Sequence, residues 1–135
     1  MKLPDKIQCQ VTVYNKPKEG ILLKATFGVI SKNSYSFIFG PTDKHGLASL
    51  HKSTVVHEAG KQLELAFMDY HPIESAFSGE ISVHPMSEDD IKRALEGAKI
   101  FRDVFPFKEG YELMLQTALK KPLLRNLAID IKRID

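Results

Sequence analysis

The densest group of chemically capable side chains in this 135-residue sequence is the segment Met68-Asp69-Tyr70-His71-Pro72. Asp69 could orient His71 for general-base chemistry, because a carboxylate that accepts a hydrogen bond from an imidazole fixes its tautomer. The segment is not accompanied by a recognisable serine or cysteine nucleophile motif. A turn in which Asp69 binds backbone amides and Pro72 sets the chain direction therefore explains it more simply.

The histidines do not have a spacing typical of a metal site. His45, His51 and His57 follow one another at intervals of six residues, whereas two ligands on one helix face lie four residues apart. His84 precedes a proline and is interpreted as a surface or capping residue. The glycines do not form a phosphate-binding loop before a helix. We expect neither a metal nor a cofactor.

Three other groups are better explained by structure than by chemistry. The Thr42-Asp43 pair is expected to bond forward into a turn. Cys9, the single cysteine, lies in an alternating apolar pattern and is expected to be a buried thiol. Core packing is favoured over base stacking for an aromatic run on one strand face, namely Tyr35, Phe37 and Phe39.

An aromatic cluster around Pro106 is the strongest candidate for an interaction surface. Its members are Phe101, Val104, Phe105, Phe107 and Tyr111. They could cover one face of the fold, which is the interpretation that we favour. If part of the cluster is exposed, it forms an apolar patch typical of a contact with another protein or a second copy.

Composition limits the class of partner and the location. Nineteen basic and seventeen acidic residues give a net charge of +2, too small to indicate nucleic-acid binding. Pro4, Asp5 and Lys6 stand where a signal peptide would need its apolar run, and no stretch is long and apolar enough for a membrane span. A lone cysteine fits a reducing compartment. We expect a soluble, cytoplasmic protein.

The first two-thirds of the chain has the pattern of short strands. Apolar and polar residues alternate from Ile7 to Val13, which is the period of a half-buried strand. Turn-forming residues separate this stretch from further strands expected at residues 21–29, 34–39, 47–50, 63–68 and 79–84. A hairpin-like connection is predicted between Gly40 and Gly46.

The pattern becomes helical after Pro85. Ser87 can cap a helix, and the acidic residues 88–90 suit its first turn. An apolar stripe extends to Phe105, and a second one runs from Tyr111 to Leu119. Residues 123–135 fit either a helix or, over 129–132, an alternating strand, and we favour the helix.

Two turn motifs carry a resemblance to a known family. Pro17-Lys18-Glu19-Gly20 and Thr42-Asp43-Lys44-His45-Gly46 resemble the Pro-x-x-Gly turn and the Thr-Asp-x-x-Gly strand entry of transthyretin-like (prealbumin-like) and carboxypeptidase-regulatory-like domains. The resemblance implies a similar β-sandwich over about residues 7–84. The hydroxyisourate hydrolases of this family end in Tyr-Arg-Gly-Ser, and that tetrapeptide does not occur in this sequence. The resemblance therefore does not imply hydrolase activity.

The sequence as a whole predicts one α+β domain, residues 1–135. Its antiparallel β-sandwich, transthyretin-like or immunoglobulin-like, covers residues 7–84, and two or three helices pack on it over 87–135. The leading functional hypothesis is a non-enzymatic protein-binding module that contacts another protein or itself. The alternatives are a small hydrolase-like enzyme that uses Asp69 and His71, and an immunity- or antitoxin-type protein.

Overall fold

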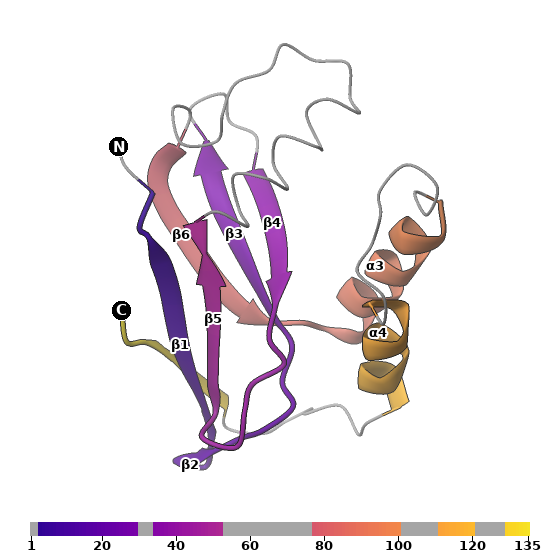
Figure 1. The fold of residues 1–135 in the computed structure, drawn as a ribbon, viewed down its shortest axis with the longest axis horizontal. Helices are drawn as coiled ribbons and strands as arrows, with labels where there is room; N and C mark the ends of the chain where they lie inside the picture. The colour runs from indigo at the N-terminus through magenta and orange to yellow at the C-terminus, as the bar shows by residue number, and fades with distance from the viewer. Residues whose placement is uncertain (1–2, 30–33, 53–76, 101–110, 121–128) are drawn as a thin grey trace.

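The computed structural model describes residues 3–29, 34–52, 77–100, 111–120 and 129–135. Within these ranges, strands come first, two helices follow, and a last strand returns to the first one (Figure 1). The α+β class is therefore confirmed, with two antiparallel sheets and two helices in the described residues.

Sheet A is built around β1 (Lys6–Val13), whose alternating residues Ile7, Cys9 and Val11 are buried as the sequence predicts. Strand β5 (Leu47–His51) pairs antiparallel with the first part of β1, and the short β2 (Lys16–Pro17) pairs with its end. Strand β7 (Ile129–Arg133) also pairs antiparallel with β1.

Sheet B places β3 between two neighbours. Its strands are β3 (Leu23–Val29), β4 (Ser34–Phe39) and β6 (Phe77–Pro85), in the order β4-β3-β6. Both pairs are antiparallel, and the register of β3 with β6 shifts between Phe27 and Val29. The expected strands in this part of the chain are confirmed, except that residues 63–68 lie outside the described ranges.

One apolar core fills the space between the two sheets, which is the arrangement of a β-sandwich. Sheet A contributes buried Ile7, Cys9, Val11, Ala48 and Leu50, and sheet B contributes Leu23, Ala25, Phe27, Phe37, Phe39 and Phe77. The Phe27 ring meets that of Phe37 edge-on, with centroids 5.6 Å apart. Each such buried ring contributes about 2–3 kcal/mol of transfer free energy.

The connection between β4 and β5 crosses from one sheet to the other, so the prediction of a hairpin there is wrong. Thr42, in the middle of this connection, is buried. Its backbone N–H donates to Ile21 O, and Gly20 N–H donates to its carbonyl. These bonds hold the chain against the segment that precedes β3, so that β5 pairs with β1 instead of β4.

The helices α3 (Glu88–Ile100) and α4 (Tyr111–Lys120) form a second apolar cluster outside the sandwich. Ile91, Leu95 and Leu115 are buried there with Leu22, and the partly buried Ile38 of β4 packs against them. The two helices lie together on the β4 side of the sandwich (Figure 1). The predicted start of a helix after Ser87 is confirmed, whereas its predicted end at Pro106 lies outside the described residues.

The preference for a helix over residues 123–135 is wrong for Ile129–Arg133, which is strand β7. Ile129 and Ile131 pack against the core between the sheets, while Asp130 and Lys132 are exposed. Pairing with β1 supplies both this apolar contact and the backbone hydrogen bonds of the segment. In the described residues, no helix is long and apolar enough to cross a membrane.

Candidate functional site

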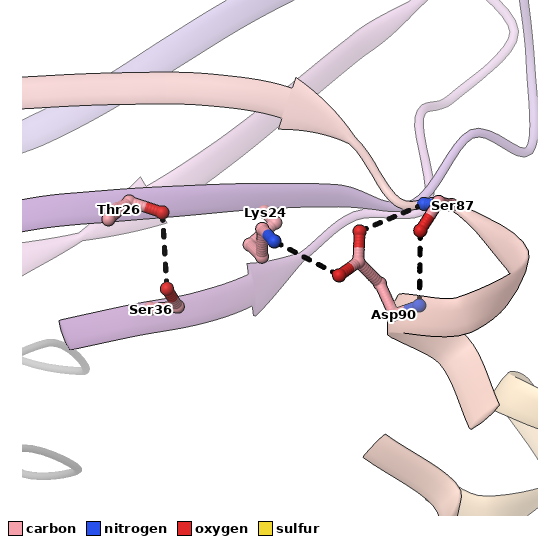
Figure 2. Close-up of polar contacts among 5 residues, drawn as sticks. All are labelled: Lys24, Thr26, Ser36, Ser87 and Asp90. Carbon is pink, nitrogen blue, oxygen red and sulfur yellow. Dashed lines mark hydrogen bonds and ion pairs between the residues drawn. The ribbon is translucent and has the colours of Figure 1, made fainter. Parts of the chain in front are cut away.

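Three hydroxyl residues lie side by side on the outward face of sheet B. Thr26 of β3 stands opposite Ser36 of β4 and Ser82 of β6. Directly opposed residues of antiparallel strands share one face of the sheet. The Thr26 and Ser36 hydroxyl oxygens are 3.1 Å apart and share a hydrogen bond (Figure 2). We call Ser36, Thr26 and Ser82 the hydroxyl row; Ser36 and Ser82 are exposed.

The neighbouring row on the same face carries charge. Lys24 of β3 stands between Ile38 and His84. Its Nζ lies 3.0 Å from Asp90 Oδ1 of α3, and both side chains are mostly buried, with 29% and 18% of their surface exposed. Figure 2 shows this ion pair beside the hydrogen-bonded Thr26 and Ser36. The ion pair therefore joins the outward face of sheet B to the first turn of α3.

Asp90 is held by the helix cap as well as by Lys24. Ser87 Oγ accepts a hydrogen bond from Asp90 N at 3.1 Å, and Asp90 Oδ2 accepts one from Ser87 N at 3.1 Å. This reciprocal arrangement is a capping box. Desolvation raises the pKa of Asp90, but the Ser87 and Lys24 hydrogen bonds outweigh it, so the pKa lies below its ordinary value. The carboxylate is therefore charged at neutral pH.

One end of the outward face has little room for side chains. A Cβ added at Gly28 of β3 would lie 2.7 Å from Ser78 Oγ and 3.3 Å from Glu80 Oε2. Ser78 and Glu80 follow one another around Gly79, where β6 shifts its register against β3. Along β3, the hydroxyl row therefore lies between Gly28 on one side and the Lys24–Asp90 ion pair on the other.

The arrangement suits recognition by hydrogen bonds. Hydroxyl groups donate and accept, the lysine ammonium donates, and the exposed imidazole of His84 can do either. Thr26 and Lys24 are already fixed by Ser36 and Asp90. A ligand that binds to groups held in this way loses less side-chain entropy than one that must order them.

Most of the candidate residues that the sequence singled out for function lie outside the described residues. Asp69 and His71 lie in the undescribed range 53–76, and Phe101, Phe105 and Phe107 lie in 101–110. Tyr111 begins α4, but its side chain is not among those described. The hydrolase-like site and the aromatic interface thus remain predictions.

The Thr42-Asp43 segment has a structural role. Asp43 Oδ1 accepts hydrogen bonds from His45 N at 2.8 Å and Leu47 N at 3.0 Å, as the turn interpretation predicts. The bond from Leu47 is the main reason why the pKa of Asp43 lies below its ordinary value. Thr42 differs from the prediction, because its hydroxyl binds backward to Lys18 and Ile21 rather than forward into the turn.

The environments predicted for Cys9, Phe37, Phe39 and His84 are confirmed. Cys9 is a buried free thiol, and burial raises its pKa. Phe37 and Phe39 are core residues, and His84 is exposed. His57 lies outside the described residues, as does the Tyr35 side chain. The described part of the chain holds no group of three or more histidine, cysteine or acidic residues that could bind a metal.

Sequence reasoning did not find the hydroxyl row or the Lys24–Asp90 pair. Alternation places Thr26, Ser36 and Ser82 on the polar faces of their own strands, and this signal is visible in the sequence. The sequence does not show the register between the strands, and this register aligns the three hydroxyl residues in one row. The capping role of Ser87 was predicted, but nothing local indicates that Asp90 would meet a lysine 66 residues away.

Comparisons with known proteins did not identify a relative. No protein-family model matches the chain, and neither a curated protein nor a solved structure does. What this protein does is therefore inferred from its own residues.

Proposed function

We propose that this chain is a non-enzymatic protein-binding module whose contact surface is the outward face of sheet B, centred on the hydroxyl row. The observation that carries the proposal is that polar side chains on this face form hydrogen bonds and an ion pair with one another. Thr26 shares a hydrogen bond with Ser36, and Lys24 pairs with Asp90. These contacts fix donors and acceptors before a partner arrives, which favours binding.

The chemistry of the face suits a protein partner. Serine and threonine hydroxyls both donate and accept, so they can bind the N–H and C=O groups of another backbone. Lys24 and Asp90 supply one charge of each sign and stay attached to each other. The small net charge of the chain, +2, agrees with a partner that is not a nucleic acid.

The proposal is tested by blocking the hydroxyl row with a large charged side chain. Ser82→Arg alters one of the two exposed serines of the row, and Ser49→Arg alters an exposed serine on the outward face of sheet A. Each immobilised protein is incubated with lysate from the source organism, and retained proteins are quantified by mass spectrometry. We expect a protein that the unaltered chain and Ser49→Arg retain and Ser82→Arg loses. Equal retention by all three, or retention by none, would contradict the proposal.

We also propose that the sandwich is of the transthyretin-like kind. The two turn motifs that carry this resemblance lie together, because Thr42 of one motif is hydrogen-bonded to Lys18 and Gly20 of the other. An experimental structure with a different connection between these turns would contradict it. We further propose a single cytoplasmic domain, since the one cysteine is a buried thiol of the kind that a reducing compartment maintains.

A further inference from the structure

The outer edge of β7 carries backbone groups that point away from β1. Only β1 pairs with β7 among the strands that the structure describes. Ile134 N, directly after β7, donates to Gln8 O at 2.8 Å, so even-numbered residues here direct their backbone groups toward β1. Successive residues of an antiparallel strand use opposite edges. The N–H and C=O groups of Ile129, Ile131 and Arg133 therefore point to the outer edge.

Strand β7 carries opposite charges on the two sides of Ile131. Asp130 and Lys132 flank it, are exposed, and stand opposite Thr12 and Gln10 on the outward face of sheet A. Ile131 faces the core between the sheets but is only partly buried. An acidic residue before the centre and a basic one after it make the strand complementary to itself in the antiparallel direction.

We propose that β7 pairs antiparallel with β7 of a second copy of this chain, with the two-fold axis at Ile131. The backbone N–H and C=O of Ile131 then bind those of Ile131 in the second copy. Asp130 faces Lys132 of the second copy, and Lys132 faces its Asp130. Sheet A of one copy continues into sheet A of the other, which pairs an edge that no other described strand covers.

The charges select this register over its neighbours. Asp130 and Lys132 occupy positions without backbone hydrogen bonds across the new contact, where opposed Cα atoms lie only about 4.5 Å apart and side chains are closest. A two-fold axis at Asp130 or at Lys132 would oppose like charges, which destabilises a strand pair. A shift by one residue would turn the side chains to the opposite face. Opposite charges meet at both contacts only in the register centred on Ile131.

The proposal is tested by charge exchange in the full chain, with association measured by sedimentation velocity. The unaltered chain should form a dimer. Asp130→Lys and Lys132→Asp each oppose like charges at both contacts, so each should weaken self-association by at least about tenfold. An equimolar mixture of the two variants restores opposite charges and should dimerise. The double variant Asp130→Lys/Lys132→Asp should dimerise like the unaltered chain.

Lys6→Asp is the matched control for Lys132→Asp, because it makes the same charge change at an exposed position of β1 in the same sheet. It should leave association unchanged. A monomeric unaltered chain, single variants that self-associate as tightly as it does, or a mixture that fails to associate would each overturn the proposal. If a single exchange disturbs folding, monitored by far-UV circular dichroism, the double variant still decides: dimerisation supports the register, and its loss overturns it.

Discussion

The Thr42 hydroxyl donates a 2.6 Å hydrogen bond to the backbone carbonyl of Lys18, and this bond joins the connection between the two sheets to the turn that precedes β3. The same oxygen accepts a hydrogen bond from Ile21 N at 3.0 Å. Thr42 is buried. Its side chain therefore satisfies two backbone groups that would otherwise have to be hydrated or left unpaired.

Removal of this hydroxyl should destabilise the fold. We expect Thr42→Val to lower the free energy of unfolding by about 1–3 kcal/mol, because it leaves Lys18 O and Ile21 N without their partner. Thr42→Ser keeps the oxygen and should lose much less. Urea denaturation followed by circular dichroism measures both values. Equal losses in the two variants would show that the methyl group, not the hydroxyl, is what matters.

The ion pair between sheet B and α3 should contribute a measurable coupling energy. In a double-mutant cycle with Lys24→Met and Asp90→Asn, we expect a coupling free energy of about 0.5–1 kcal/mol, because the two side chains are mostly buried but remain partly hydrated. The pair Lys92 and Glu88, on the more exposed side of α3, is the comparison. Its coupling should be smaller. A larger coupling for Lys92 and Glu88 would contradict the assigned role of Lys24.

Acid should weaken the fold partly through Asp90. Its pKa is lowered in the folded state from the ordinary value of 3.8, so the unfolded chain binds protons more readily than the folded one. The stabilising effect is present above pH 3.8 and is lost as pH falls through the lowered pKa. We expect Asp90→Asn to be less stable than the unaltered chain at pH 7 and to lose less stability on acidification. Parallel curves of unfolding free energy against pH would contradict this.

Two glycines should respond to alanine in opposite directions. Gly97 lies within α3, and among the residues that the structure describes an added Cβ would meet nothing within 4 Å, so Gly97→Ala should raise the free energy of unfolding by about 0.5–1 kcal/mol. Gly46 has a positive φ of 75°, and its Cβ would collide with Val11 O. Gly46→Ala should therefore cost at least about 1–3 kcal/mol. Thermal unfolding of the two variants gives the comparison, and a stable Gly46→Ala variant would show that the turn can rearrange.

Much of the local structure could be predicted because short-range patterns cause it. Alternation alone identifies the inward residues of β1, and a serine before acidic residues marks the start of α3. The role of Asp43 was predictable for the same reason, since its hydrogen bonds reach only two and four residues ahead. Such features depend on neighbours in the chain, and the sequence contains them in full.

Long-range pairing decided what the sequence left open or led us to predict wrongly. The segment 129–133 has apolar residues that suit a helix or a strand. It forms a strand because its backbone pairs with β1 and its isoleucines pack against the core between the sheets. Strand β5 joined β1 rather than β4 because Thr42 anchors the connection at a distant turn. The hydroxyl row and the Lys24–Asp90 pair likewise depend on register and helix placement. Local propensity determined most of the elements of this protein. Burial and hydrogen bonding between distant segments determined β7 and how the elements meet, because both are satisfied only once the whole chain is folded.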